Sequence, residues 1–373
     1  MMGFFNIVAV ILLSAYCFLL FLALIPLLLP KKDSMKLIQQ KQSFVSVIIA
    51  ARNEEKNILA LLESLSLQNL PKDNYEIIIV SDNSTDNTLS LLEEYKEKKP
   101  ETNISFYFIE NQYPSKKVAL EYAVEKAKGE ILIFTDADCL VDENWISSYL
   151  FLFQDKKLQF ATGKINLLGK KNLLYAFQQM EWSALMAITA SSIYYSVPLM
   201  ANGANMAIRR QAFLDIKPYE SNKDIASGDD MFLLAAVKKR FGAKAVCFNS
   251  NAHIKTVAAD NFLSFITQRI RWAKKNYFSL STALLAAVFV LLSQMATIFL
   301  LLTVVFDFYF LQWSFFLLMA KFFLEFSLIL CYKRSITLLY LPLLAIIYPF
   351  YVCFIAFASP FIRVRWKSNT TKA

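Results

Sequence analysis

The stretch that decides the fold is Gly129-Glu130-Ile131-Leu132-Ile133-Phe134-Thr135-Asp136-Ala137-Asp138-Cys139. A glycine that suits the end of a helix is followed by an apolar run short enough for a buried strand. Two carboxylates, Asp136 and Asp138, then stand one residue apart where the strand ends. Such a pair suits a capped loop. It also suits a cation, because ligands of open α/β sheets bind beyond the carboxyl ends of the strands.

Long apolar runs lie at both ends of the chain. The 373 residues are 56% hydrophobic and include 33 Phe but only 7 Gly, which is too apolar for an ordinary soluble enzyme of this length. Residues 4–29 form one run and residues 281–362 hold several more, whereas the middle of the chain carries most of the charge. The sequence therefore predicts membrane segments on either side of a polar central region.

The first apolar run, Phe4 to Leu29, contains no charged residue and is long enough to cross roughly 30 Å of hydrocarbon. A secretory signal peptide is the alternative, but it would need a basic start, a shorter apolar core and a small-residue cleavage site. We therefore expect a retained anchor. Because Pro30-Lys31-Lys32 follows it directly, the positive-inside rule places the central region in the cytoplasm.

Two further spans are predicted after the central region, from Leu280 to Phe306 and from Leu311 to Tyr332. Lys321 and Glu325 lie one helical turn apart inside the second of them. We expect these two side chains to pair with each other and to face protein rather than lipid.

The last apolar run, Ile336 to Phe361, is interrupted by Pro342 and Pro349 and is followed by the basic stretch 363–367. If this run crossed the membrane fully, the basic tail would lie outside, against the positive-inside rule. A re-entrant or interfacial hairpin would keep the tail in the cytoplasm, and it is the preferred interpretation.

The net charge of +9 fits a chain that works beside an anionic membrane leaflet and on a phosphate-bearing substrate. No recognition helix or aromatic and basic sheet motif indicates nucleic-acid binding. The five cysteines are scattered without C-x-x-C spacing, which predicts neither a disulfide framework nor a zinc site. The sole histidine, His253, is interpreted as structural rather than as a metal ligand.

The central region repeats a unit of strand, polar turn and helix. Strands are predicted at residues 44–51, 75–80, 104–109 and 131–134, with helices at 58–65, 89–95 and 116–128. This alternation predicts an α/β fold with a mostly parallel sheet and crossover helices.

Acidic or amide side chains follow three of these strands: Asn53 and Glu54, then Asp82, then Asp136 and Asp138. Singly, a residue such as Asp82 could equally be a helix cap. Three such groups at one edge of a parallel sheet indicate a binding site instead.

Together these strand ends resemble the nucleotide-sugar site of family 2 glycosyltransferases, which have the GT-A fold. The resemblance runs in order along residues 44–275. Residues 46–55, Ser-Val-Ile-Ile-Ala-Ala-Arg-Asn-Glu-Glu, resemble the opening strand and turn of the family, with alanine at the usual proline. Residues 80–86, Val-Ser-Asp-Asn-Ser-Thr-Asp, resemble its Val-Asp-Asp-Gly-Ser-Thr-Asp. Ser81 replaces the first aspartate and Asn83 the glycine, a choice that suits a turn with positive φ. These departures leave the identity of the nucleotide open.

Four later motifs continue the resemblance. Residues 115–120, Ser-Lys-Lys-Val-Ala-Leu, are similar to the Gly-Lys-x-x-Ala-Leu of the family, and residues 202–210 to its Gly-x-Asn-x-x-x-Arg-Arg strand. Residues 227–234 resemble the Asp-Asp motif that opens a helix near the transferred sugar. Gln268-Arg269-Ile270-Arg271-Trp272 matches the Gln-x-x-Arg-Trp signature, and a basic amphipathic helix that enters the membrane is the alternative interpretation.

The resemblance implies a role for each of these residues. Asp138, assisted by Asp136, would hold Mg²⁺ or Mn²⁺, and Asp230 would be the general base beside Asp229. Contacts to the nucleotide sugar would come from Ala51, Asn53, Glu54, Asp82 (against the uracil), Lys116 and Asp136. Gln268, Arg271 and Trp272, which share one helix face, would contact the acceptor and the leaving diphosphate. The apolar helix predicted over residues 172–196 is either a core helix or an interfacial helix that feeds a lipid acceptor.

These roles imply an integral-membrane, inverting glycosyltransferase with a cytoplasmic catalytic domain. Its parts would be an anchor (1–32), a GT-A domain (44–275), a membrane region (276–367) and a tail (368–373). A UDP-sugar is the expected donor and a lipid the expected acceptor, because about three apolar segments after the domain are few for a polymer channel. A processive polysaccharide synthase is the runner-up. A non-catalytic scaffold subunit or transporter is the hypothesis from another class, and the intact motifs speak against it.

Overall fold

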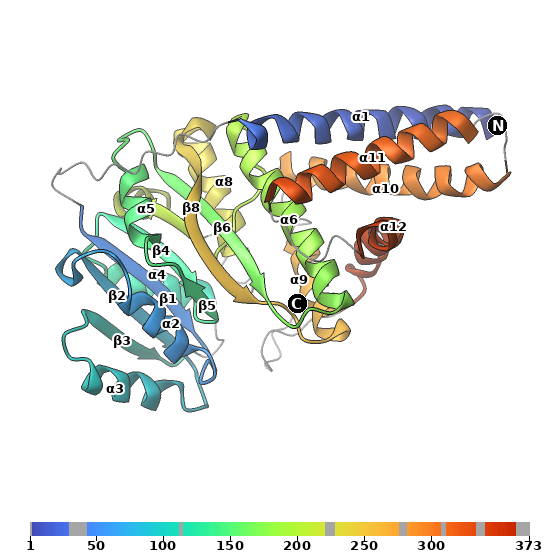
Figure 1. Ribbon diagram of the computed structural model, residues 1–373. Coiled ribbons are helices and arrows are strands. Elements are labelled where there is room, and N and C mark those ends of the chain that lie inside the picture. The colour runs from blue at the N-terminus through green and yellow to red at the C-terminus, as the bar shows by residue number, and fades with distance from the viewer. Residues whose placement is uncertain are drawn as a thin grey trace.

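In the computed structural model the described residues are 2–29, 43–111, 115–220, 228–275, 282–306, 311–332 and 340–362. The structure has two parts: an α/β part built on one sheet and a group of long apolar helices beside it (Figure 1). Helix α6 (Leu173–Tyr194) leaves the sheet and packs on two of the long helices, so it joins the two parts.

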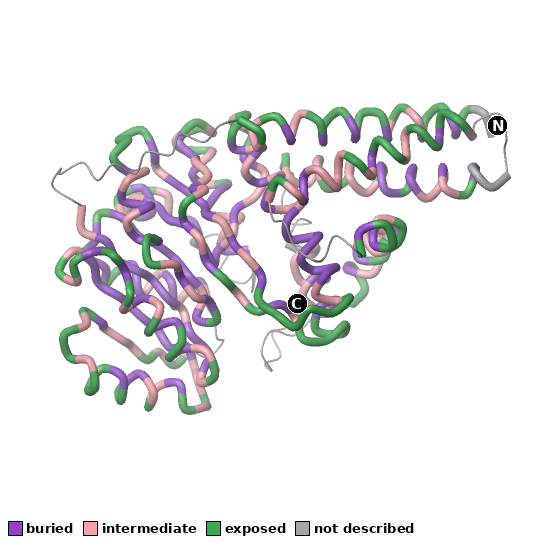
Figure 2. The backbone as a smooth tube through the Cα atoms, in the orientation of Figure 1, coloured by how far each residue is buried: buried purple, intermediate pink, exposed green. Residues whose placement is uncertain are grey.

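The first four strands form the parallel half of the sheet. β1 (Val45–Ala51), β2 (Tyr75–Asp82), β3 (Ile104–Ile109) and β4 (Ile131–Asp136) lie in the order β3-β2-β1-β4, and all three pairings are parallel. The strands are apolar and mostly buried (Figure 2), as expected when helices cover both faces. The predicted strands of this half are confirmed.

Three predicted crossover helices are also confirmed: α2 (Ile58–Ser66), α3 (Thr88–Lys98) and α4 (Lys116–Lys126). Alternate residues of β1 point to opposite faces of the sheet. Val47 and Ile49 pack in the same cluster as Leu62 of α2, whereas Ile48 packs in a second cluster with Leu120 of α4. The sheet therefore has one apolar core on each face.

The second half of the sheet departs from the expectation of a mostly parallel sheet. Beyond β4 the order is β7 (Met206–Arg209), β6 (Phe160–Leu168), β8 (Val246–Val257) and β5 (Cys139–Val141). β7 is antiparallel to both β4 and β6, β6 and β8 are parallel, and β5 and β8 are antiparallel, so the eight-stranded sheet is mixed. The reason is α6, which leaves the sheet instead of crossing over it. A crossover helix would return the chain to a parallel strand, and without one β7 can run antiparallel.

The remaining helices of this part are α5 (Trp145–Leu152), α7 (Arg210–Ile216), α8 (Asp229–Phe241) and α9 (Phe262–Lys275), together with single 3₁₀ turns at Lys72–Asn74 and Ala243–Ala245. Neither α5 nor α7 was predicted from the sequence. α8 and α9 begin and end near the motifs that the sequence singled out, and both contribute to the cavity described below.

Asn205, which precedes β7, connects three segments of the second half of the sheet. It is fully buried, and its Oδ1 accepts from Trp145 Nε1 at 2.8 Å and from Tyr149 Oη at 2.7 Å. Its Nδ2 donates to the carbonyl oxygens of Lys164 and Ala252, both at 2.9 Å. All the hydrogen-bonding capacity of this amide is thus used to hold α5, β6 and β8 together.

We expect Asn205→Ala to destabilise the protein by roughly 3 kcal/mol, because two buried donors lose their acceptor and two carbonyl groups lose their donor. Thermal unfolding in detergent, followed by tryptophan fluorescence, measures the loss. Asn251→Ala is the matched control, since Asn251 is exposed in the same β8 strand. Equal stability of the two variants would contradict this role of Asn205.

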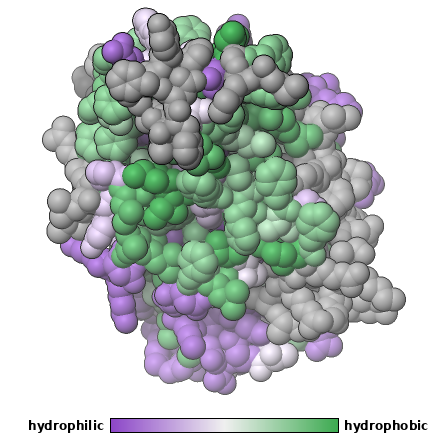
Figure 3. Space-filling view, turned by 90° about the vertical axis from the view of Figure 1, so that its right-hand side faces the viewer, coloured by the Kyte–Doolittle hydropathy of each residue, from purple (hydrophilic) through white to green (hydrophobic). Residues whose placement is uncertain are grey.

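Within the described residues, four helices are long and apolar enough to cross a membrane: α1 (Met2–Leu28), α10 (Thr282–Phe306), α11 (Leu311–Tyr332) and α12 (Leu341–Ala358). α1, α10 and α11 run side by side, with mostly exposed apolar outer faces (Figures 1 and 2). Seen from their far end, hydrophobic residues cover the middle of the surface and hydrophilic residues lie below (Figure 3). Lys321 Nζ lies 2.9 Å from Glu325 Oε2 and Lys321 is only 3% exposed, which confirms the predicted pair.

The last apolar run is not the hairpin that its prolines suggested. Leu341–Ala358 is one helix, with Pro342 in its first turn, where a missing N–H costs nothing, and Pro349 inside it. Its axis lies across those of α1, α10 and α11, and it packs against α9 and α10 (Figure 1). The basic stretches 30–32 and 363–367, on which the orientation argument depended, lie outside the described residues.

Candidate active site

A cavity of about 1290 Å³ opens at the carboxyl ends of the parallel strands and continues between the apolar helices. Its polar end is lined by side chains of the strand ends and of α4, α8 and α9. Of the predicted site residues, it contains Ala51, Glu54, Asp82, Lys116, Asp136, Asp138, Asp229, Asp230, Gln268, Arg271 and Trp272. The tertiary fold thus brings together residues up to 221 positions apart, from Ala51 to Trp272.

Asn53 is the predicted site residue that does not line the cavity. It has a left-handed backbone (φ 53°), its N–H donates to Ser84 Oγ at 3.1 Å, and its Oδ1 accepts from the Thr85 N–H at 2.8 Å. Asn53 therefore ties the turn after β1 to the turn after β2. Asn83 also has a positive φ, of 52°. This agrees with the prediction from the family motif, in which glycine stands at the position of Asn83.

Asp82, at the end of β2, is buried and held in place. Its Oδ2 accepts from the Ser115 N–H at 2.6 Å and its Oδ1 from Asn111 Nδ2 at 3.2 Å. Burial raises the pKa of this carboxyl, against the effect of those two donors and of the Arg52 charge. Arg52 itself is 7% exposed and lines the cavity, although the sequence analysis did not select it.

Lys116, the second residue of the Ser-Lys-Lys motif, bridges two carboxylates from distant parts of the chain. Its Nζ lies 2.7 Å from Asp136 Oδ1 at the end of β4 and 3.0 Å from Asp229 Oδ2 at the start of α8. Burial acts to lower the pKa of Lys116, but the attraction of Asp136 and Asp229 outweighs it and raises the pKa well above its ordinary value. The three side chains form one charged cluster that connects the two sides of the site.

Gly203 leaves the space that this cluster needs. A Cβ at this position would lie 2.7 Å from Asp229 Oδ2, closer than such atoms pack, and 3.4 Å from Lys116 Nζ, which is an ordinary contact. The glycine of the motif at residues 202–210 is thus explained by close approach.

We expect Gly203→Ala to lower the turnover of the enzyme at least about tenfold, because the added methyl group displaces the Asp229 carboxylate from Lys116. Initial rates of sugar transfer, measured beside thermal unfolding midpoints, separate this effect from general instability. A variant with the wild-type rate would show that the cluster tolerates the displacement.

Asp136 and Asp138 flank Ala137 in the turn between β4 and β5, and both line the cavity. Asp136 has a side chain 37% exposed, and Asp138 is exposed, so both carboxylates face solvent within the cavity. Among the described residues no group of three His, Cys, Asp or Glu side chains is placed to hold a metal. Two carboxylates fit a hard divalent cation that takes its other ligands from water and phosphate oxygens.

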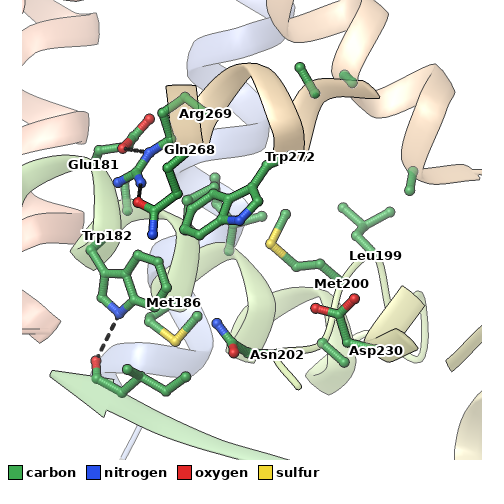
Figure 4. A pocket seen from close by; sticks show the side chains of 18 of the residues that line it. Glu181, Trp182, Met186, Leu199, Met200, Asn202, Asp230, Gln268, Arg269 and Trp272 are labelled. Atoms are coloured by element: carbon green, nitrogen blue, oxygen red, sulfur yellow. Dashed lines mark hydrogen bonds and ion pairs between the residues drawn. The ribbon is translucent and has the colours of Figure 1, made fainter. Parts of the chain in front are cut away.

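Asp229 and Asp230 are the first two residues of α8 and follow Gly228, which has a positive φ of 88°. Their carboxylates lie at the positive end of the helix dipole. Asp229 pairs with Lys116, whereas Asp230 lines the cavity beside Leu199 and Met200 and opposite Trp272 (Figure 4). Both aspartates line the cavity, and Lys116 pairs with the first of them, Asp229.

Gln268, Arg271 and Trp272 all line the cavity, together with Arg269 and Ala273 of the same helix. Burial lowers the pKa of Arg271, while Asp136, Asp229, Asp138 and Asp230 act to raise it, so this guanidinium lies in the field of all four carboxylates. Trp272 packs on Trp182 of α6, with ring centroids 5.5 Å apart (Figure 4).

Arg269, Glu181 and Trp182 also line the cavity, and sequence reasoning did not assign them to the site. Arg269 is 5% exposed and its Nε donates to Glu181 Oε2 at 2.6 Å, so it is not one of the solvated basic residues that the amphipathic alternative implied. The signal in the sequence was Glu181, a lone carboxylate in the apolar run 172–196, which calls for a buried partner.

The other end of the cavity is apolar. α6 contributes Leu185, Met186 and Ile188, and α1, α10, α11 and α12 complete the wall with mostly apolar side chains. Many residues of α6 are buried, as the core-helix interpretation of residues 172–196 predicted, and the helix also borders the apolar end of the cavity. The interfacial interpretation stays a prediction.

Part of the chain is similar to known glycosyltransferases. Residues 46–216 match the family described as Glycosyl transferase family 2. The chain is 27% identical over 176 residues to a dolichyl N-acetyl-alpha-D-glucosaminyl phosphate 3-beta-D-2,3-diacetamido-2,3-dideoxy-beta-D-glucuronosyltransferase of Methanococcus voltae, which covers 46% of this chain and 50% of the relative. It is 26% identical over 186 residues to glycosyltransferase AglE of Haloferax volcanii, covering 50% and 59%. The chain thus spans about half the length of these curated relatives.

Among solved structures, the mannosyltransferase PcManGT of Pyrobaculum calidifontis, in complex with GDP-Man and Mn²⁺, has a TM-score of 0.62 at 18% identity and covers 95% of this chain and 98% of its own. At that identity the likeness concerns the fold, and it extends over the apolar helices as well as the sheet. Over β1 to α7 the chain is thus similar to family 2 glycosyltransferases, which supports a glycosyltransferase.

Proposed function

We propose that this protein is a membrane-bound glycosyltransferase that moves a sugar from a nucleoside diphosphate sugar to a lipid or lipid-linked acceptor. The observation that carries the proposal is the single cavity, which joins the carboxylate cluster at the strand ends to an apolar space between the long helices. A polar donor and an apolar acceptor can therefore meet without the acceptor leaving a hydrophobic environment. The family match of residues 46–216 supports the reaction class.

The donor occupies the strand-end side of the site. Asp82 is fixed for contact with the base, and Arg52, Lys116 and Arg271 supply positive charge for the diphosphate. A UDP-sugar is the first candidate, and a GDP-sugar is the second because the structural neighbour binds GDP-Man.

A divalent cation, Mg²⁺ or Mn²⁺, would be held by Asp138 and Asp136. Bound there, it supplies a positive charge that stabilises the departing diphosphate. The structural neighbour was solved with Mn²⁺, which supports this assignment. Lys116 and Arg271 place further cationic charge on the same side of the site, so the chain itself contributes to the neutralisation.

The acceptor enters from the membrane side, between α6 and the long helices. Asp230 takes the proton of its nucleophilic hydroxyl, which then attacks the anomeric carbon from the face opposite the diphosphate, with inversion. Trp272 and Trp182 form an aromatic wall beside this position. Acceptors in the names of two relatives are a dolichyl-linked sugar phosphate and poly(ribitol-phosphate), which favours a lipid-linked or polymer acceptor.

The arrangement of the helices supports three membrane spans. α1 ends, α10 begins and α11 ends beside the α/β part, so that part lies on one side of the membrane, which we propose to be the cytoplasm (Figure 1). α12, which lies across these helices, would then rest in the plane of the membrane as an interfacial helix.

The test is transfer from a panel of radiolabelled UDP- and GDP-sugars by purified protein, with native lipid extract and with or without Mn²⁺. Metal-dependent label in the organic phase is the expected result. Label found only in high-mass aqueous material would replace the lipid acceptor with polysaccharide synthesis. Binding of UDP or GDP without transfer from any donor would favour the scaffold hypothesis.

A further inference from the structure

Gln268 is held by a chain of hydrogen bonds that starts in a different helix of the apolar part. Tyr351 Oη in α12 donates to Glu181 Oε1 in α6 at 2.8 Å. Glu181 Oε2 accepts from Arg269 Nε at 2.6 Å, and Arg269 Nη1 donates to the side-chain oxygen of Gln268. Glu181 and Arg269 are both more than nine-tenths buried, so the chain is shielded from water.

This chain of hydrogen bonds fixes which end of the Gln268 amide faces the cavity. A guanidinium carries only donors, so the amide must turn its oxygen toward Arg269 and its Nε2 toward the ligand space. Figure 4 shows the nitrogen on the side of Trp182 and Met186 and the oxygen on Arg269. A side chain that ordinarily offers both a donor and an acceptor is thus reduced to a donor.

Arg269 fixes the neighbouring indole as well. Its guanidinium lies 4.3 Å from the ring centroid of Trp272 and 4.6 Å from that of Phe265. Trp182, which packs on Trp272, is itself held by a hydrogen bond from its Nε1 to the Ile165 carbonyl at 3.1 Å. One buried arginine therefore orients both the amide donor and the aromatic wall of the same subsite.

A contribution to folding stability is a weak explanation for this chain of hydrogen bonds. A buried ion pair loses so much hydration that apolar residues of the same size would often be at least as stable. The chain also ends on Gln268 at the cavity, where orientation has a use, rather than in the core.

We propose that Glu181, Arg269 and Tyr351 are positioning residues that hold Gln268 as an obligate hydrogen-bond donor in the acceptor subsite. This positioning role rests on the function proposed above, and it defines the chemistry of the acceptor group. The acceptor atom beside Gln268 is an oxygen that offers a lone pair, in a phosphate or a hydroxyl. An ammonium group, which has only donors, is excluded from that position. α12, far from Gln268 in the sequence, thereby controls acceptor binding.

Tyr351→Phe is the variant of choice, because it removes one hydroxyl and keeps the ring that stacks on Phe265 at 5.6 Å. Tyr340→Phe is the matched control: it removes the same group at the exposed start of α12. The first readout needs no substrate. The five tryptophans are replaced by 5-fluorotryptophan in the full-length protein in detergent, and their ¹⁹F resonances are assigned by single Trp→Phe variants.

We expect Tyr351→Phe to shift or broaden the Trp272 resonance and to leave those of Trp145 and Trp313 in place, since Trp272 is the tryptophan that lies on Arg269 among the described residues. Tyr340→Phe should leave all of them unchanged. An unchanged Trp272 resonance in Tyr351→Phe would overturn the proposal, whether or not the protein transfers sugar.

The second readout is kinetic. Acidic and neutral fractions of the native lipid extract serve as acceptors in separate arms, which distinguishes a phosphate from a hydroxyl. Tyr351→Phe should raise the half-saturating lipid concentration about fivefold in the arm that accepts label and leave the KM of the donor unchanged. In a Gln268→Ala background the same substitution should have no further effect, because its influence passes through Gln268.

The two readouts separate the two proposals. Additive effects of Tyr351→Phe and Gln268→Ala, or equal changes in the KM of donor and lipid, would overturn the positioning role and leave the glycosyltransferase function intact. Absence of transfer by the wild-type protein would refute the proposed function, while the Trp272 resonance would still decide whether α12 positions this subsite.

Discussion

Asp230→Asn is expected to reduce sugar transfer by about 10²- to 10⁴-fold, the contribution of a carboxylate that accepts a proton from an attacking hydroxyl. The amide keeps the shape of the side chain but cannot accept that proton. Because Asp230 faces the cavity while Asp229 is paired with Lys116 at 3.0 Å, the neighbouring carboxylate cannot replace it without losing that pair. The KM of the nucleotide sugar should be little changed, since no donor contact is assigned to Asp230.

The measurement is the initial rate of label transfer at saturating donor and lipid, together with the affinity for UDP and GDP. Asp215→Asn is the control, because Asp215 is an exposed carboxylate that accepts from Gln211 at 2.7 Å. A rate for Asp230→Asn within about threefold of the control would remove Asp230 from the base role.

Asp138→Asn is expected to abolish the effect of divalent cations on donor binding and to lower turnover on the order of a hundredfold. An amide is neutral and a poorer ligand for a hard cation than a carboxylate. In the wild-type protein Mn²⁺ should tighten the binding of the nucleoside diphosphate, and in the variant it should have no effect.

Calorimetric titration of UDP and GDP with and without Mn²⁺ tests this without any acceptor. Asp142→Asn is the matched control: Asp142 follows the same turn but pairs with Lys255 at 3.2 Å, outside the cavity. If donor binding by Asp138→Asn kept the full response to Mn²⁺, Asp138 would not be a ligand of the cation. The cation would then be held by other residues or by the nucleotide alone.

The apolar pattern of the sequence was sufficient for the parallel half of the sheet and for the long helices. Strands such as Tyr75–Asp82 and Ile131–Asp136 contain continuous apolar runs, residues 77–80 and 131–134, because helices cover both faces of the sheet, and such runs can be read locally. The same holds for the ion pair Lys321–Glu325, whose spacing of four residues is a property of one helix.

The antiparallel half was harder to predict for a physical reason. β7 has only four residues, Met206–Arg209, and its place between β4 and β6 depends on the path of α6 through the other part of the molecule. The hairpin predicted around Pro342 and Pro349 was wrong for a similar reason: a proline in the first turn costs nothing, and packing on α9 and α10 accommodates the second.

By itself the sequence determined the residue types of the site, since Asp82, Asp136, Asp138, Asp230 and the Gln-x-x-Arg-Trp helix all line one cavity. The tertiary structure alone decided how they are used. In the folded protein Asp229 pairs with Lys116, and Asn53 connects the turn after β1 to the turn after β2. Arg269 is buried and donates to Glu181, which also accepts from Tyr351. A sequence records which charges and donors exist, but their partners lie up to 170 residues away, and only folding sets the distance between them.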